Sequence, residues 1–335
     1  MNELNHWHPV LLSKNIKQKP VGIKLCGQEI AVFRTQSGKI GAIEDICSHR
    51  KMRLSKGWVE GNRLVCPYHG WNYGCDGKGH SLSTPHLRFC TKNFDAIEKH
   101  GLIWIKASQS EAKFPSLDFE NYHFVCALEH HINAPLELVV DINSEVEHAA
   151  TTHTFFGHNI SQVSEVEVKF DFSDREVVKF IETMPQKPLP KVIKRLFGIS
   201  DTDRFVDKIE VHFSPLYKIS QLYWENHKTG QIRKERIKSA FFFTPISEKE
   251  TKWISLYYLA SPRWGRIMFH LLQKRVLKHI LNYEINRDKW VLENLADRSL
   301  EFDPMCLGRF DKTLVENRKR IQSIYRGQRQ AVLLN

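Results

Sequence analysis

The sequence predicts an α+β protein of two domains, in which a small all-β module is followed by a larger domain built on an antiparallel sheet. Three observations support this prediction. Short β-rich segments separated by glycine turns fill the N-terminal third, longer strand-like segments fill the middle, and helical periodicity dominates the C-terminal end. A length of 335 residues is also typical of about two domains.

The first domain is predicted to cover residues 1–115. Its turns fall at Ser37-Gly38 and Asp76-Gly77, and its strands are predicted at Glu29–Arg34, Ile40–Glu44, Leu64–Cys66 and Leu102–Ile105. The stretch 108–121 is polar and irregular and contains Pro115, which is typical of a linker. The second domain is therefore expected to cover 116–335.

The second domain is expected to begin with a helix over Leu136–His153. Strand-like segments follow at Glu165–Phe172, Glu176–Thr183, Lys208–Phe213, Lys218–Trp224, Ile237–Thr244 and Trp253–Leu259. Apolar residues at three- and four-residue spacing then predict helices over Arg266–Tyr283, Arg287–Arg298 and Lys312–Tyr325. This order predicts a large antiparallel sheet with helices after it.

The amino-acid composition indicates a globular protein without a disulfide framework. Apolar residues make up 41% and charged residues 26%, as in a globular protein. The N-terminus lacks a signal-peptide pattern, and no run reaches the roughly 18 apolar residues of a membrane span, so a cytoplasmic location is expected. Seven cysteines, an odd number, make a disulfide framework improbable and direct attention to metal binding.

The formal net charge is +11, but it does not identify a partner. Basic residues are spread along the chain, and no nucleic-acid-binding motif is present, so no nucleic-acid partner is expected. The segment 263–283 combines apolar and basic residues. Core packing with a basic outer face is the preferred interpretation of this segment, and contact with a membrane surface is the alternative.

The strongest motif is a pair of cysteine–histidine loops. Cys47 and His49 are followed after sixteen residues by Cys66 and His69, in the pattern C-x-H-x16-C-x2-H. Each loop supplies one thiolate and one imidazole. A Rieske [2Fe–2S] cluster needs this mixture, because two cysteines hold one iron and two histidines hold the other. A structural zinc site is the alternative, although zinc ligands more often pair cysteine with cysteine and histidine with histidine.

At these residues the chain resembles the Rieske domain of ring-hydroxylating oxygenases, in which C-x-H-R is followed by C-P-Y-H-G-W. The resemblance covers about residues 7–106. Respiratory Rieske proteins carry an extra cysteine in each loop, whereas this chain has Met52 and Tyr68 there. The resemblance therefore implies an oxygenase terminal (alpha) subunit, with a Rieske domain followed by a helix-grip catalytic domain.

A second motif follows the cluster loops at the distance that the family shows. Two histidines, His148 and His153, lie five residues apart and would face about 140° apart on an ideal helix, so a shared metal requires local distortion. The family holds a mononuclear Fe(II) with two histidines and one carboxylate. By resemblance to a D-K-x-V-[IL]-E helix, the third ligand is Asp288. Competitors for this position are Glu284, Glu293 and Asp297.

Two positions near these histidines depart from the family pattern. The chain has Asp141 where the family usually has asparagine, and Glu145 where the family has a bridging aspartate. Both keep a polar or acidic group, so both are expected to serve catalysis, with Glu145 as the bridge between His69 of one subunit and His148 of its neighbour. His158 is expected to be an ordinary surface or core histidine.

The resemblance implies an oxidoreductase that uses dioxygen to hydroxylate, demethylate or oxidatively cyclise an organic, aromatic or hydrophobic substrate. Electrons come from NAD(P)H through a separate ferredoxin or flavin reductase to the cluster and then to the iron, across the subunits of a homotrimer. The chain length resembles that of monooxygenases and demethylases more than that of aromatic dihydroxylating dioxygenases. The alternative is a Rieske electron carrier or binding protein with an inactive second domain.

Overall fold

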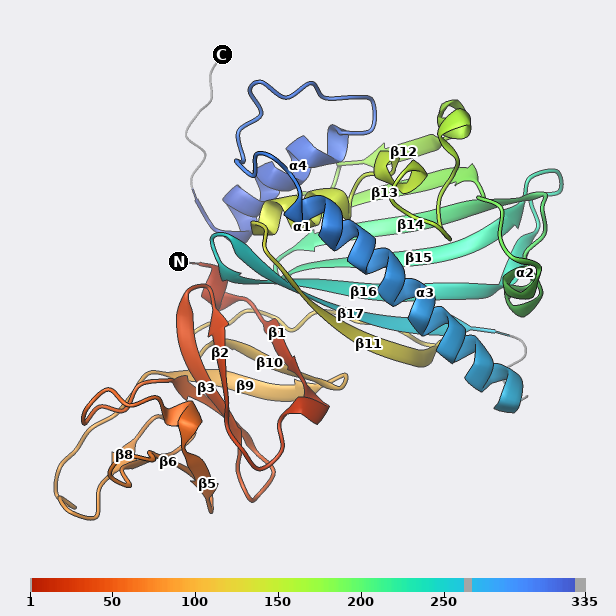
Figure 1. Ribbon diagram of the computed structural model, residues 1–335. Coiled ribbons are helices and arrows are strands. Elements are labelled where there is room, and N and C mark those ends of the chain that lie inside the picture. The colour runs from red at the N-terminus through yellow and green to blue at the C-terminus, as the bar shows by residue number, and fades with distance from the viewer. Residues whose placement is uncertain (1, 262–266, 329–335) are drawn as a thin grey trace. The chain divides into compact units, whose positions relative to one another are not determined.

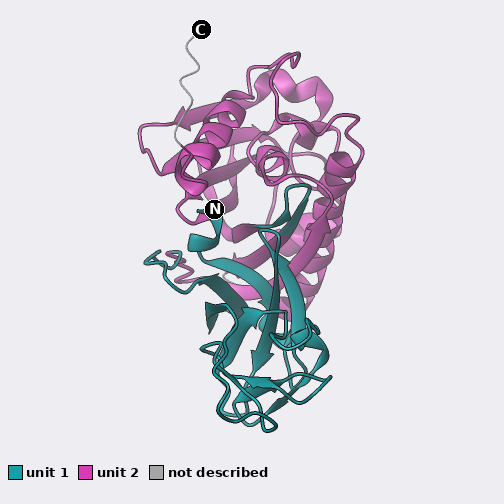
Figure 2. Ribbon diagram, turned by 90° about the vertical axis from the view of Figure 1, so that its left-hand side faces the viewer, with its two compact units in different colours: residues 1–115, 244–252 teal, residues 116–243, 253–335 magenta. Residues whose placement is uncertain are grey.

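The computed structural model describes residues 2–261 and 267–328, and the chain divides into two compact units (Figure 2). Unit 1 comprises Met1–Pro115 and Thr244–Lys252. Unit 2 comprises Ser116–Phe243 and Trp253–Asn335. The segment that joins unit 1 out of sequence is the turn of a long hairpin, where Thr244 Oγ1 donates to the carbonyl of Pro9 at 2.8 Å.

Unit 1 contains two sheets and short 3-10 turns. Its larger sheet has the order β1-β10-β9-β4-β3-β2, from β1 (His8–Leu12), β2 (Val21–Leu25), β3 (Gln28–Arg34), β4 (Ile40–Glu44), β9 (Asn93–Lys99) and β10 (Leu102–Ala107). The smaller sheet has the order β5-β6-β7-β8, from β5 (Trp58–Glu60), β6 (Arg63–Val65), β7 (Asn72–Tyr73) and β8 (Gly79–His80). Neighbouring strands in both sheets run antiparallel.

Unit 2 is built on a seven-stranded sheet. The strand order is β11-β17-β16-β15-β14-β13-β12, from β11 (His123–Ile132), β12 (Glu167–Asp171), β13 (Val177–Pro185), β14 (Asp203–Phe213), β15 (Leu216–Asn226), β16 (Ile232–Ser247) and β17 (Glu250–Ala260). The helices are α1 (Leu136–Ile142), α2 (Lys191–Phe197), α3 (Ile267–Glu293) and α4 (Lys312–Arg320). Helix α3 runs across one face of the sheet (Figure 1).

The predicted α+β fold class, with an N-terminal β domain and a large antiparallel sheet, is confirmed. Side chains alternate along β14, where Phe205, Ile209 and Phe213 are buried in the core of unit 2. This period of two is what places one face of a strand on the core. The same alternation had marked most of the strands of this sheet in the sequence.

The helix predicted over Leu136–His153 is wrong in its extent. Helix α1 ends at Ile142, because the next two side chains turn back onto its last carbonyls: Asn143 donates to Val139 O and Ser144 to Val140 O, each at 2.8 Å. Such side-chain bonds compete with continuation of a helix. A 3-10 turn, η4 (Glu147–Ala150), follows.

The C-terminal helices also differ from the prediction. One continuous helix, α3, replaces the two helices predicted over Arg266–Tyr283 and Arg287–Arg298. The last helix matches the prediction, because α4 continues into a π turn at Ile321–Tyr325. No helix in the described part of the chain is long and apolar enough to cross a membrane.

The segment 263–283 was expected to pack in the core, and this holds for only part of it. Residues 262–266 lie outside the described residues. Leu277 and Leu281 are buried, whereas Met268, Leu271 and Leu272 are exposed. The inward-facing stripe of α3 therefore begins near its start, where Phe269 packs against the core and His270 and Gln273 are buried, and it becomes mainly apolar from Leu277.

Candidate metal centres

The two cysteine–histidine loops of unit 1 have the same backbone design. The N–H of Cys47 donates to Met52 O and the N–H of Cys66 to Trp71 O, both at 2.8 Å. Each cysteine carbonyl in turn accepts a hydrogen bond from the residue four places on, Lys51 or Gly70. Lys51 and Gly70 have φ of 58° and 72°. The positive φ closes each loop tightly and is free of strain only at the glycine.

The side chains of the two loops converge. The thiols of Cys47 and Cys66 are both 1% exposed, whereas His49 and His69 are exposed and their ring centroids lie 4.6 Å apart. His49 is held by stacking on Trp71 at 4.5 Å. The hydroxyl of Tyr73 donates to Cys47 Sγ at 3.3 Å.

This donor set fits a Rieske cluster. Two buried thiols lie on the inner side and two imidazoles on the outer side, which matches one iron held by cysteines and one held by histidines. Backbone N–H groups of Tyr68 and His69 also point at the sulfur of Cys66. Hydrogen bonds of this kind tune the potential of a cluster once it is bound.

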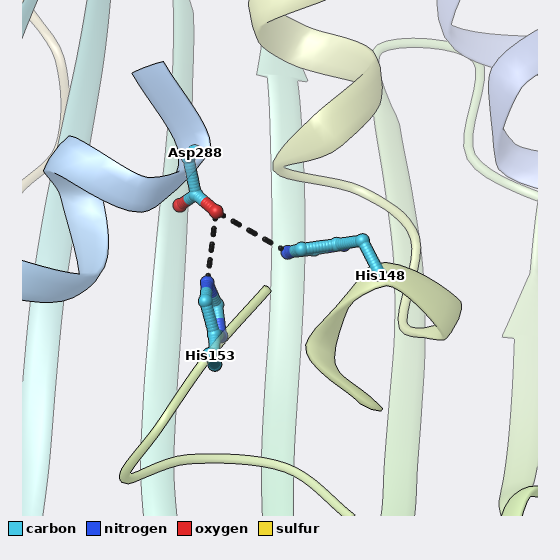
Figure 3. Close-up of side chains that lie close together, drawn as sticks. All are labelled: His148, His153 and Asp288. Carbon is cyan, nitrogen blue, oxygen red and sulfur yellow. Dashed lines mark hydrogen bonds and ion pairs between the residues drawn. The ribbon is translucent and has the colours of Figure 1, made fainter. Parts of the chain in front are cut away.

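The second set of predicted ligands meets in unit 2. Nε2 of His153 lies 2.8 Å and Nε2 of His148 lies 3.5 Å from the same carboxylate oxygen of Asp288 (Figure 3). Ligand atoms of these three residues all lie within 4.8 Å of one another. His148 comes from η4, His153 from the loop after it, and Asp288 from α3. The departure from an ideal helix that lets the two rings meet lies between them, because the 3-10 turn η4 ends at Ala150 and His153 is in the following loop.

The chemistry of this triad fits an iron(II) ion. Two imidazoles and one carboxylate on one side, with the other positions open, are typical of non-haem iron oxygenases. Nε2 of His148 is buried and has no hydrogen-bond partner among the described residues. A bound metal would satisfy this nitrogen.

The predicted bridging residue Glu145 contacts His148 directly. Its Oε1 accepts a hydrogen bond from Nδ1 of His148, and its Oε2 accepts from the backbone N–H of Glu147 at 2.6 Å. Burial lowers the pKa of His148, but the attraction of Glu145 and then Asp288 outweighs burial and raises the pKa to about 9. Glu145 therefore fixes the ring so that Nε2 faces Asp288.

The competing acidic residues have other partners. Glu284 accepts hydrogen bonds from the backbone N–H groups of Thr154 and Phe155 and so holds the loop that carries His153 to α3. Glu293 accepts from the N–H of Asn133, and Asp297 accepts from Ser299. The sequence suggests Glu284 only as a competing ligand, and nothing in the sequence indicates that it anchors this loop.

Asp141 and His158 lie apart from the triad contacts. The carboxylate of Asp141 pairs with Arg318, with Oδ2 lying 2.7 Å from Nη2, and so ties α1 to α4. Burial raises the pKa of Asp141 to about 7, although Arg318 opposes this shift. Asp141 does not line the cavity described below, whereas its neighbour Asn143 does. His158 is completely buried.

A cavity of about 120 Å³ lies beside the triad. His148, His153 and Asp288 form part of its wall. The inner face of the sheet, helix α3, the end of α1 and the loops around η4 form the rest. Most of the lining is apolar and aromatic: Ile142, Val146, Phe156, Met184, Phe205, Leu222, Phe241, Trp253, Tyr257, Leu281 and Ile285. A mostly apolar cavity with a few convergent polar groups is typical of a small-molecule site.

Comparison with known proteins agrees with both centres. Residues 6–94 match the model of the Rieske [2Fe–2S] domain, and residues 132–326 match the vanillate O-demethylase oxygenase C-terminal domain. The chain therefore belongs to the Rieske non-haem iron oxygenases. Within them it belongs to the group that has the vanillate O-demethylase oxygenase C-terminal domain. The family prediction and the predicted cofactors, a Rieske cluster and a mononuclear iron, are confirmed.

Individual relatives show how far the likeness extends. The vanillate O-demethylase oxygenase subunit of Pseudomonas sp. (strain HR199 / DSM 7063) is 27% identical over 224 residues, which is 63% of this chain and 62% of the relative. Chlorophyllide a oxygenase of Arabidopsis thaliana is 33% identical over 156 residues, covering 45% of this chain and 29% of the relative. The chain thus aligns with less than two thirds of the length of either relative.

A solved structure covers nearly the whole chain. Dicamba monooxygenase bound to 3,6-dichlorosalicylic acid has a TM-score of 0.79 and 20% identity, with 97% of this chain and 98% of that chain covered. At this identity the likeness shows the fold. It includes both the Rieske β domain and the large antiparallel sheet.

Proposed function

We propose that this chain is the terminal oxygenase component of a Rieske system that oxidises a small organic substrate, as a monooxygenase or demethylase. The observation that carries the proposal is the convergence of His148, His153 and Asp288 on the wall of a mostly apolar cavity. The relatives named as an O-demethylase and a monooxygenase support this reaction type. Hydroxylation and demethylation both begin by oxidising a C–H bond held next to the metal.

The residues of the chain have distinct tasks in this proposal. Bound iron would supply dioxygen activation with electrons that the cluster delivers. Glu145 orients His148, and Glu284 holds the loop of His153. The aromatic lining of Phe205, Phe241 and Trp253 holds an apolar substrate and excludes water from the reacting atoms.

The electron supply is proposed to be external. A separate ferredoxin or flavin reductase would pass electrons from NAD(P)H to the cluster, whose histidines His49 and His69 are exposed. The net charge of +11 favours an acidic redox partner. All seven cysteines are free, which supports a reducing, cytoplasmic location.

Substrate-dependent oxygen consumption tests the proposed function. The anaerobically purified, iron-loaded chain is mixed with a surrogate reductase, NADH and a panel of small methoxylated and methylated aromatic compounds. We expect at least one compound to raise oxygen uptake and to yield a product that has lost a methyl group or gained one oxygen atom, as measured by mass spectrometry. A chain that never forms product, and that holds only the two irons of a cluster, would instead be an electron carrier.

Replacement of Glu145 tests the proposed bridge to a neighbouring subunit. In a homotrimer, Glu145 would link His148 to His69 of the adjacent subunit's cluster and so connect the two metal centres. We expect Glu145→Gln to keep most of the cluster and the mononuclear iron, while product formation and cluster reoxidation in a single turnover fall at least about tenfold. Rapid-mixing absorbance spectroscopy measures the reoxidation.

Two controls sharpen this prediction. His148→Ala should lose the mononuclear iron, whereas Glu145→Gln should not. Mixed trimers of Cys66→Ser and His148→Ala chains should regain part of the activity, because one subunit then supplies the cluster and its neighbour the iron. Normal turnover in Glu145→Gln, or mixed trimers without activity, would show that the bridge is assigned wrongly.

A further inference from the structure

A strip of polar side chains crosses the sheet wall of the cavity. Glu182 on β13, Asp207 on β14, and Lys218 and Ser220 on β15 all line it. Each side chain points to the core side of the sheet, because the residues two places before and after it on the strand are apolar or buried. The strip therefore occupies core positions that would ordinarily carry apolar residues.

The side chains of this strip differ in how many hydrogen bonds they make. Asp207 accepts a hydrogen bond from Ser220 Oγ at 2.6 Å, and the ammonium group of Lys218 donates to the carbonyl of Asn143 at 2.5 Å. Glu182 is only 6% exposed, and within the described residues its carboxyl group has no hydrogen-bond partner. An unsatisfied carboxyl group that faces a cavity is a candidate to bind something that enters the cavity.

The charges of the strip do not balance. Glu182 and Asp207 are directly opposite one another in the sheet register, so two carboxyl groups face each other with one ammonium group nearby. Burial, and then the facing Asp207, raise the pKa of Glu182 to about 8. Burial also raises the pKa of Asp207. A second negative charge on this part of the wall is therefore unfavourable. A ligand that brings a hydrogen-bond donor or a positive charge would stabilise the two carboxyl groups.

The size of the cavity limits what can bind. A volume of about 120 Å³ is somewhat smaller than the roughly 150 Å³ of an engineered cavity that accepts benzene. The aromatic and aliphatic side chains that line the rest of the cavity fit a ring. A compound with one ring and one polar substituent matches both parts of the wall.

We propose that the cavity selects small aromatic substrates that carry an N–H or O–H donor and no carboxylate, with Glu182 as the specificity-determining acceptor. This inference rests on the proposed oxygenase function and names its substrate class. The acids in the names of two relatives, vanillate and 3,6-dichlorosalicylic acid, are then the wrong class for this chain. A carboxylate would have to pair with Lys218, whose ammonium group already donates to the carbonyl of Asn143 and is attracted by Asp207 and Glu182.

A matched series of four ligands tests the inference by binding alone. The probes are benzylamine, benzyl alcohol, ethylbenzene and benzoate, which share a ring with one substituent and differ in charge and donor capacity. Calorimetry on the iron-loaded chain without dioxygen measures the Kd of each. The amine and the alcohol are expected to bind at least about tenfold more tightly than the benzoate and the ethyl compound.

Substitutions at Glu182 test whether this residue causes the preference for ligands with a hydrogen-bond donor. Glu182→Leu should bring the four Kd values to within about threefold of one another, because the donor then meets an apolar side chain. Glu182→Gln keeps an acceptor and the shape, so it should retain the alcohol and weaken the amine. Glu210→Gln, on the opposite face of β14 with its side chain 47% exposed, should leave the series unchanged.

The outcomes separate this inference from the proposed function. Tighter binding of the benzoate, a donor preference that survives in Glu182→Leu, or no binding of any probe would overturn the inference. Each of these results is compatible with an oxygenase that forms product from another compound. Donor-selective binding without any oxygen consumption would support the inference and refute the oxygenase function.

Discussion

Replacement of Cys66 by serine is expected to abolish the cluster and leave the second metal in place. The iron content should fall from about three to about one per chain and acid-labile sulfide to near zero, because one of the two thiolates that hold an iron is gone. Activity with a surrogate reductase should fall to background. Iron and sulfide analysis, together with electron paramagnetic resonance of the reduced protein, measures the change.

Cys90→Ser is the matched control, because Cys90 is an exposed free cysteine of the same unit. It should keep the full iron and sulfide content. Tightly bound zinc in the wild-type chain, with no labile sulfide, would contradict the assignment of the cluster loops.

The second large effect is expected at Asp288. Asp288→Asn should empty the mononuclear site while the cluster spectrum stays unchanged, because the ligands of the two centres lie in different compact units. Product formation should fall by at least about a hundredfold, since even changes around a metal ligand cost about 10- to 100-fold. Metal analysis and product yield in a single turnover measure the two effects.

Asp297→Asn is the control for this variant, since Asp297 is exposed and accepts hydrogen bonds from the nearby Ser299. It should retain iron and turnover. An Asp288→Asn chain with full iron would require another carboxylate as the third ligand, and Glu284 is the acidic residue nearest in the sequence.

Both sets of predicted ligands could be found in the sequence because each depends on local features. Cys47 and His49 share one loop, as do Cys66 and His69, so the spacing alone specifies the donors. Asp288 is 135 residues from His153 and could be proposed only through the resemblance to the family. The structure brings these residues together across the unit.

The helix break near the iron site was harder to predict. The apolar periodicity of residues 136–142 continues weakly into the next segment, and propensity does not show that Asn143 and Ser144 will bond back to α1. The five-residue spacing of the two histidines predicts a departure from an ideal helix. It does not show that α1 ends at Ile142 or that a separate 3-10 turn carries His148.

The polar strip of the cavity had a signal in the sequence that was not used. In Phe205–Asp207–Ile209 a charged residue takes the place of an apolar one in a period-two pattern, and Leu216–Lys218 repeats this on the next strand. Charged residues at core-facing positions of neighbouring strands indicate a cavity that polar side chains line. Only the register, which pairs Glu182 with Asp207, shows that they form one site.

Glu284 and Asp288 lie four residues apart on the same face of α3, and together they fasten the loop of His153 by its backbone and by its ring. Because Glu284 holds the loop through backbone N–H groups and not through a metal ligand, this contact lowers the conformational freedom of the loop independently of the metal. We therefore expect the affinity for iron to depend on Glu284, although Glu284 is not a ligand.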